Sequence, residues 1–379
     1  MDDAMVAGIY IHIPFCRAKC AYCDFNSYAG AEHWIPQYQQ ALLYEIARSL
    51  GGRGVAARTV FLGGGTPTLL PAEHLSALLH AVPLDASCDE ISIEANPGTV
   101  TADELVLLRR SGMNRISLGV QSMDDTELAL LGRIHDRETA IASFALARAA
   151  GFDNINVDLI FGMPGQALST WRRTLDDVLR LEPEHIALYA LTLEPGVPLS
   201  AAIECGTLPV PDDDAMAEMY EWAEDRLSSG GYVHYEISNW SLPGRECTHN
   251  LIYWRNEPYL GLGAGAWSFW QGHRWGNVTG IAEYVAACDD AGSTVGESET
   301  VSAAQEMADT VILRLRLVEG IRFEAFEARF GHPLLRVYGP QVDRLVMLGL
   351  LERDERGIRL TRRGRLLGNE VFEQFLAAD

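Results

Sequence analysis

The chain has 379 residues, 48% of them hydrophobic, which is enough for one large core and one or two smaller ones. A formal net charge of −22 leaves no basic footprint, and this excludes general binding to nucleic acid or anionic lipid. No apolar run approaches the roughly 20 residues of a membrane span, and the acidic N-terminus does not resemble a secretory signal, so we expect a cytoplasmic protein.

Short β-branched runs alternate with helical stretches through the first half of the chain. The predicted strands are 8–15, 58–66, 90–97, 115–122, 154–164 and 185–193, and the predicted helices between them are 33–50, 72–82, 101–111, 138–150 and 169–181. This alternation indicates parallel strands, which we expect to be apolar on both faces. Six units occupy residues 1–205, whereas a closed eight-unit barrel needs roughly 250 residues. The sequence therefore predicts an α/β fold, a partial (βα)6 TIM-like barrel.

Unusual polar features follow five of these strands. They are the cysteines after the first strand, Gly63 to Pro67 after the second, Glu94 and Asn96 on the third, Gln121 and Ser122 on the fourth, and Asp158 with the turn 162–165 on the fifth. Barrels of this kind place their chemistry at the carboxyl ends of the strands. Five such features at one mouth favour a functional site.

Three of the seven cysteines lie in the segment CRAKCAYCDFN, with the spacing C-x3-C-x2-C. The other four, Cys88, Cys205, Cys247 and Cys288, are scattered, and we expect each to be a small buried hydrophobe. Structural zinc normally takes four protein ligands, and no nearby His or Cys completes the set. Cys16, Cys20 and Cys23 instead suit a four-iron cluster that leaves one iron open.

The motif, with Tyr22 before its third cysteine, resembles the radical S-adenosylmethionine (radical SAM) superfamily. The resemblance implies a [4Fe–4S] cluster whose open iron binds S-adenosylmethionine (SAM), and a partial six-unit barrel is that superfamily's fold. Lys19, inside the motif, is the only lysine among 30 basic residues. We attribute the shortage of lysine to codon bias, although the position is notable.

Six segments narrow the resemblance to the oxygen-independent coproporphyrinogen oxidase family. They are IYIHIPFCRAKCAYCDF, FLGGGTPT, IEANPGT, ISLGVQS, LGRIHDR and VDLIFGMPGQ. The resemblance implies that the SAM-contacting positions are Tyr10, Gly64, Gly65, Thr66, Glu94, Gln121, Arg133 and Asp158. The residues themselves support Glu94 and Asp158, because charges in buried strands are costly unless used. Arg133 is equally well explained as a solvated helix charge.

Two features point to one branch of that family. Phe25 stands where the decarboxylases carry a fourth cysteine, and their long N-terminal arm is missing, so the chain resembles the heme-chaperone branch, the HemW proteins. The second half carries His249-Asn250-x-x-Tyr253-Trp254, which matches the HNxxYW signature of that branch. The resemblance implies that His249, Tyr253 and Trp254 contact heme, whose iron takes an axial His or Tyr. The alternative is a structural loop held by buried aromatic side chains.

The rest of the chain has two further parts. We expect 206–300 to cover the open side of the barrel, with a helix that ends at Gly230 and a linker over 291–302. Residues 301–379 resemble a small winged-helix-like domain. Its 12 Arg against 12 Asp or Glu make it neutral, so we reject DNA binding and expect docking on the barrel or on a partner.

Two hypotheses remain. The first is a heme chaperone that binds heme, the cluster and SAM and delivers heme to respiratory-type heme proteins; its partners are an apo-heme protein acceptor and an electron donor, with a homodimer left open. The second is a radical enzyme acting on a tetrapyrrole or other substrate, such as a decarboxylase, a methyltransferase or a heme-opening enzyme. Phe25 and the HNxxYW signature favour the first, whereas the complete SAM site keeps the second open.

Overall fold

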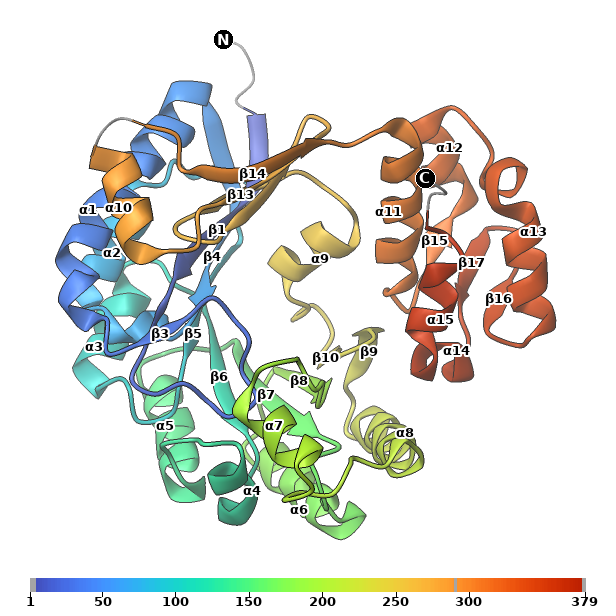
Figure 1. The fold of residues 1–379 in the computed structure, drawn as a ribbon, viewed down its shortest axis with the longest axis horizontal. Coiled ribbons are helices and arrows are strands. Elements are labelled where there is room, and N and C mark those ends of the chain that lie inside the picture. The colour runs from blue at the N-terminus through green and yellow to red at the C-terminus, as the bar shows by residue number, and fades with distance from the viewer. Residues whose placement is uncertain (1–4, 290–291, 377–379) are drawn as a thin grey trace.

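The computed structural model describes residues 5–289 and 292–376, and its main body is built on a twelve-stranded sheet (Figure 1). Six parallel strands at its centre follow one another in chain order. They are β1 (Met5–Ile13), β4 (Val55–Gly64), β5 (Glu90–Ala95), β6 (Arg115–Gln121), β7 (Ile155–Phe161) and β8 (His185–Ala190). The six predicted strands and the open (βα)6 arrangement are therefore confirmed.

Helices cover the outer face of these strands (Figure 1). They are α1 (Ile35–Ser49), α2 (Ala72–Ala81), α3 (Ala102–Arg110), α4 (Asp125–Leu130), α5 (Arg137–Ala149) and α6 (Leu168–Leu179). All but the short α4 are predicted by the sequence. Helix α3 starts with a capping box, in which Thr101 and Glu104 satisfy each other's backbone N–H groups. Between helices and sheet lies the main core, which includes Ile9, Val60 and Trp171.

The inner face of the parallel strands is polar, so the expectation of two apolar faces is wrong. Buried polar side chains point into the barrel from the first residues of the strands onward, namely Thr59, Glu90, Ser92, Arg115, Ser117, Asn156 and His185. They are partnered to one another, for example Asn156 with Ser117 and with His185. Buried polar groups persist where they are hydrogen-bonded, and here the barrel interior supplies the partners.

Residues 206–300 extend both edges of the sheet, in place of the expected cover over its open side. After α7 (Pro198–Glu204) and α8 (Asp213–Ser229), β9 (Val233–Glu236) and β10 (Asn239–Ser241) continue the β8 edge. The β1 edge is continued by β11 (Tyr259–Leu262), β12 (Trp267–Trp270), β13 (His273–Asn277) and β14 (Val295–Thr300). Helix α9 (Thr248–Trp254) and α10 (Ile281–Asp289) join these strands.

The predicted linker 291–302 is in large part a strand, because β14 pairs antiparallel with β13. Residue 291 lies outside the described residues. All six residues of β14 are exposed, so no hydrophobic alternation marks it in the sequence. Arg274 on β13 forms an ion pair with Glu299 on this outermost strand. Charged side chains on an edge strand oppose pairing with other chains.

The C-terminal region forms a separate winged-helix-like unit with its own core. It contains α11 (Ala303–Leu315), β15 (Ile321–Arg322), α12 (Phe323–Phe330), α13 (Leu334–Met347), β16 (Leu351–Arg353), β17 (Gly357–Leu360), α14 (Arg362–Leu366) and α15 (Gly368–Glu373). Arg362 and Arg365 form ion pairs with Glu224 on α8, so the unit docks on the main body. Residues 301–379 remain our proposed extent for it. No helix within the described residues is long and apolar enough to cross a membrane.

Candidate functional site

A cavity of about 480 Å³ opens at the carboxyl ends of the parallel strands. All three clustered cysteines line it, and so do six of the eight predicted SAM-contacting residues, namely Gly64, Gly65, Glu94, Gln121, Arg133 and Asp158. Phe25 lies at the same cavity, 65% exposed. Residues on or directly after five successive parallel strands therefore meet where the sequence predicts a site.

Tyr10 and Thr66 lie beside this cavity and do not line it. The Tyr10 hydroxyl is 3.0 Å from Nδ1 of His12, inside the barrel. Thr66 is buried between the cysteine loop and β5, because its Oγ1 accepts a hydrogen bond from Asn96 and lies 3.7 Å from Sγ of Cys16. Thr66 therefore lies behind Cys16, which lines the cavity.

The cysteine loop packs closely against the glycine loop that follows β4. A Cβ atom at Gly65 would lie 3.0 Å from Sγ of Cys16 and 2.6 Å from the Phe15 carbonyl oxygen, so only glycine lets the loop approach so closely. Arg133 Nη1 donates to Sγ of Cys20 at 3.4 Å. The chemistry of three free thiols around one cavity fits a [4Fe–4S] cluster.

The spacing of these thiols does not fit a single metal ion. Among the described residues, no three His, Cys, Asp or Glu side chains converge as the ligands of one ion would. Ligands of a single zinc ion must all reach within about 2.3 Å of it. Cluster cysteines bind separate irons, so their sulfur atoms stand farther apart. Burial raises the pKa of the Cys23 thiol, an effect that the nearby Lys19 ammonium opposes.

Two acidic side chains, Glu94 and Asp158, form the inner wall of the cavity. Burial raises the pKa of Glu94 to about 8, and the neighbouring charge of Asp158 adds to the increase. Burial also raises the pKa of Asp158, although it accepts hydrogen bonds from Ser117 at 2.9 Å and Asn156 at 2.7 Å. Two carboxyl groups on one wall of a cavity can stabilise a cationic ligand, or hydroxyl groups that donate to them.

Arg133 and Gln121 are fixed by the site. Arg133 donates to the carbonyl oxygen of Gly119 at 2.6 Å and to the side chain of Asn96, so the alternative of a solvated helix charge is wrong. Gln121 has φ of +69° at a register shift between β6 and β7. A non-glycine residue in this backbone region is strained, and such strain gathers at functional positions.

The HNxxYW segment lies far from the cysteines, at the amino-terminal ends of the strands. It forms helix α9, which packs inside the barrel against β1 and β4 and faces the C-terminal unit on its other side (Figure 1). Glu90, at the start of β5, accepts hydrogen bonds from the backbone N–H groups of Thr248 and His249 at 2.6 and 3.1 Å. A carboxylate at a helix amino terminus is favourable, so Glu90 anchors this floor of the barrel.

His249 is sequestered in this floor, with 1% of its surface exposed. Its Nδ1 is 2.8 Å from the Thr59 hydroxyl, and its Nε2 is 2.9 Å from the Tyr253 hydroxyl. Burial lowers its pKa to about 3, and the positive charge of Arg115 contributes, so the ring is neutral at physiological pH. Both ring nitrogens are occupied, and neither is directed to solvent.

Trp254 points to the C-terminal unit. The guanidinium of Arg316, which follows α11, lies 4.4 Å from the centre of its indole ring. Its Nε1 atom is buried and has no hydrogen-bond partner among the described residues. The structure therefore brings His249, Tyr253 and Trp254 together on one helix and separates them from the cysteine cavity.

Ser117 and the 43% exposed Tyr189 line the cavity and escaped the sequence prediction. Asn96, which the sequence places among the polar residues at the strand ends, links Thr66 to Arg133. The signal for Ser117 was present, because polar or small residues alternate along β6 at 115, 117, 119 and 121. Tyr189 has no such signal, since its strand is apolar on both sides of it.

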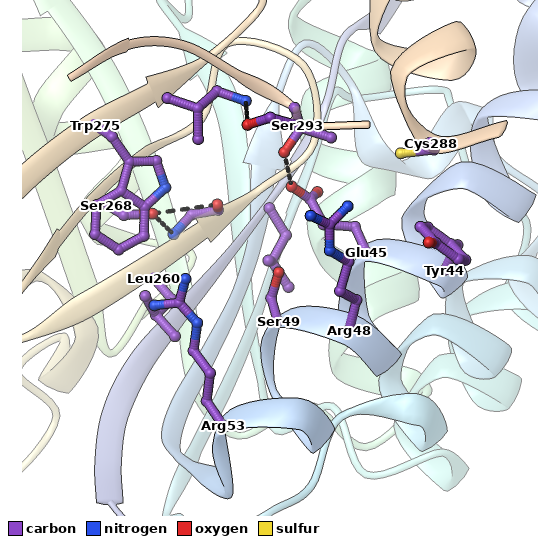
Figure 2. A pocket seen from close by; sticks show the side chains of 14 residues that line it. Tyr44, Glu45, Arg48, Ser49, Arg53, Leu260, Ser268, Trp275, Cys288 and Ser293 are labelled. Carbon is purple, nitrogen blue, oxygen red and sulfur yellow. Dashed lines mark hydrogen bonds between the residues drawn. The ribbon is translucent and has the colours of Figure 1, made fainter. Parts of the chain in front are cut away.

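A second cavity of about 170 Å³ lies between α1 and strands β11 to β13 (Figure 2). Glu45 on α1 is buried there and accepts four hydrogen bonds, from the Gly263 N–H and the side chains of Asn277, Tyr284 and Thr294. Each carboxylate oxygen accepts two of these hydrogen bonds, so Glu45 links α1 to the region of β11 to β14. This cavity contains none of the predicted site residues.

Comparison with known proteins agrees with this geometry. Residues 10–178 match the radical SAM superfamily, and residues 301–367 match the HemN C-terminal domain. The heme chaperone HemW of Bacillus subtilis is 37% identical over 372 residues, which cover 97% of this chain and 98% of that protein. The chain belongs to the HemW family. The HemW protein of Escherichia coli is also 37% identical, over 98% of both chains.

Family membership confirms the resemblance seen in the sequence. A solved structure of coproporphyrinogen III oxidase (HemN) from Escherichia coli, described as a radical SAM enzyme, superimposes with a TM-score of 0.85 at 26% identity. The match covers 98% of this chain and 90% of that one. The HemW-family chain thus shares the architecture of an oxidase while its sequence groups with chaperones.

Proposed function

We propose that this HemW-family protein is a heme chaperone that holds a [4Fe–4S] cluster, binds SAM, and delivers heme to respiratory-type heme proteins. The observation that carries the proposal is the cavity in which Cys16, Cys20 and Cys23 face the two carboxyl groups of Glu94 and Asp158. Full-length similarity to proteins named heme chaperones supports the heme part. A cytoplasmic location and a homodimer remain predictions.

The residues around the cavity suit the parts of SAM. When bound, a cluster of this class supplies one electron for reductive cleavage of the SAM sulfonium. We propose that Arg133, a guanidinium beside Cys20, binds the SAM carboxylate, because guanidinium pairs well with planar anions. Glu94 is placed for the amino group, and Gln121 and Asp158 for the ribose hydroxyl groups. Gly64, Gly65, Thr66 and Tyr10 complete the proposed SAM site.

SAM binding is expected to tighten as pH rises toward 8. Glu94, with a pKa raised to about 8, is protonated in the ligand-free protein at pH 7, whereas a cationic ligand favours its ionised form. Binding below pH 8 therefore releases a proton, and affinity rises by at most about tenfold per pH unit up to that value. Equilibrium titration of the anaerobically reconstituted protein with SAM between pH 6.5 and 8.5 measures this pH dependence of the affinity.

The matched variant is Glu94→Gln, which keeps the size and removes the titration. The SAM affinity of this variant is expected to be lower than that of the wild type and nearly independent of pH between 6.5 and 8.5. The same group gives a stability effect of known sign. Between pH 4.5 and about 8 the folded protein binds more protons than the unfolded chain, so this contribution to stability falls as pH rises. An unchanged pH slope in Glu94→Gln would remove Glu94 from the proposed role.

Heme binding by His249, Tyr253 and Trp254 carries a structural condition. Both ring nitrogens of His249 are hydrogen-bonded inside the barrel floor, so ligation of heme iron requires either Nδ1 to leave Thr59 or Nε2 to leave the Tyr253 hydroxyl. The helix has only seven residues, and its amino terminus is held by two hydrogen bonds from its backbone N–H groups to the Glu90 carboxylate. We propose that α9 opens when heme binds, which also exposes Tyr253 and Trp254 to the macrocycle.

The alternative function is a radical enzyme acting on a tetrapyrrole or other substrate. It is favoured by one observation, that the acidic wall, Arg133 and the cysteines are all assembled, although a carrier has no evident need for them. Anaerobic assay with coproporphyrinogen and a reductant separates the two. We expect no decarboxylation, since Phe25 occupies the position of the fourth cysteine of the decarboxylases. Product at a rate within about tenfold of a true oxidase would establish the enzyme instead.

A further inference from the structure

One residue of the cysteine loop stands out by its type. The chain has 30 basic residues, and Lys19 is the only lysine, so the remaining 29 (30 minus 1) are arginine. It lies between Cys16 and Cys20. Codon bias explains why arginine replaces lysine generally, but it does not explain why this one position keeps lysine.

The contacts of Lys19 give a reason. Its Nζ atom donates to the carbonyl oxygen of Phe25 at 2.5 Å, to the carbonyl oxygen of Ser27 at 3.3 Å, and to the Ser27 hydroxyl at 3.0 Å. An ammonium group has three N–H donors and no acceptor, so these three oxygens use all of its capacity. The bonds close a ring of chain from residue 19 to 27 that contains Cys20 and Cys23.

Arginine cannot make the same set of bonds. Its donors are spread over the edge of a planar guanidinium, a geometry that suits carboxylate or phosphate. Here three oxygens from two nearly adjacent residues converge on a single nitrogen atom, and two of them, the carbonyl and the hydroxyl of Ser27, belong to a buried residue. A guanidinium carbon in that place would push the loop outward and leave at least one of the acceptors unpaired.

We infer that Lys19 is a positioning residue that organises the loop carrying Cys20 and Cys23 before any iron arrives. The inference rests on the proposed function, in that the loop is taken to hold the cluster. The ring through Lys19 fixes the segment on one side, and the bond from Arg133 to Cys20 holds it on the other. A preorganised ligand set captures and retains a cluster better than a loose one.

The test uses the full chain with Lys19→Arg, Lys19→Met and a matched control, Arg17→Lys. Arg17 is exposed in the same loop, and its side chain makes no hydrogen bond or ion pair within the described residues. After anaerobic reconstitution, the half-time of cluster loss to an iron chelator is measured at 420 nm. We expect at least tenfold faster loss in both Lys19 variants and less than twofold change in Arg17→Lys. Equal half-times in wild type and Lys19→Arg would overturn the inference.

A second readout needs no cluster. Metal-free wild type and Lys19→Arg are alkylated with iodoacetamide, and peptide mass spectrometry follows Cys20 and Cys23 against Cys205, which is exposed and outside the loop. Wild type and Lys19→Arg both carry a positive charge at residue 19, so a difference in alkylation rate reports a difference in the order of the loop. We expect at least threefold faster alkylation of Cys20 and Cys23 in Lys19→Arg. Equal alkylation rates in the two proteins would overturn the inference. Faster alkylation in Lys19→Arg, in a protein that takes up no iron on reconstitution, would support the role of Lys19 in loop order and refute the proposed cluster binding.

Discussion

Replacing Cys16, Cys20 or Cys23 with alanine is expected to reduce the bound iron from about four atoms per chain to none. Each of the three thiols lines the same cavity, and no other cysteine does. A three-cysteine cluster already has one iron without a protein ligand, so it has no redundancy. Iron and sulfide analysis after anaerobic reconstitution, together with the absorption near 400 nm, measures the effect.

The matched controls are alanine variants of Cys88, Cys205 and Cys288. Cys88 is half-buried before β5 and Cys205 is exposed after α7, so the expectation that both are buried is wrong, whereas Cys288 is buried in α10 as expected. None of the three lines the cavity. These variants are expected to keep the full iron content. Loss of iron in any control comparable with that in Cys20→Ala would show that the cluster is held elsewhere. Exposure to air is expected to bleach the wild-type cluster, because one iron is unprotected by protein.

Replacing His249 with alanine is expected to shift the Soret band of bound heme and weaken its binding by about tenfold. Heme should still bind, because burial of the macrocycle contributes roughly 25 cal/mol per Å² of apolar surface without the iron ligand. The iron–sulfur content should not change, since α9 lies at the opposite end of the strands from the cysteines. Anaerobic heme titration and iron analysis on the same sample give both values.

Because His249 is buried, a second experiment tests whether α9 opens when heme binds. If heme is bound through α9, the backbone amides of 248–254 should exchange at least tenfold faster with deuterium once heme is added. In the heme-free protein they are held by Glu90 and by the packing of the helix in the barrel. A bound Soret band with unchanged exchange, or an unchanged spectrum in His249→Ala, would place heme on another surface and leave α9 as a structural floor.

The sequence predicts the parallel half of the fold well, for identifiable reasons. Strands such as 155–161 are rich in β-branched and other apolar residues and lie between clear helix signals, and Thr101 with Glu104 marks a helix start that the structure reproduces. The site could be located because the carboxyl ends of parallel strands must meet. Six of the eight proposed SAM residues line one cavity for that reason.

Other features depend on tertiary contacts that the sequence does not display. Strand β14 is wholly exposed, so its pairing with β13 is visible only in three dimensions. The sequence predicts strands that are apolar on both faces, whereas Arg115 and Asn156 belong to a polar barrel interior. The HNxxYW segment suggests an accessible heme site in the sequence. In the structure, hydrogen bonds with Thr59 and Glu90, about 190 and 160 residues earlier in the chain, hold it inside the barrel.

Transfer of heme to an acceptor tests the central claim most directly. The anaerobically reconstituted protein is loaded with one equivalent of heme, separated from free heme, and mixed with an apo-heme protein of the respiratory type while the acceptor's spectrum is followed. We expect the acceptor spectrum to appear faster than passive heme release to apomyoglobin allows, and the triple Cys16/Cys20/Cys23→Ala variant to bind heme but not to accelerate transfer. No bound heme in the wild type, or transfer no faster than passive release, would contradict the chaperone function.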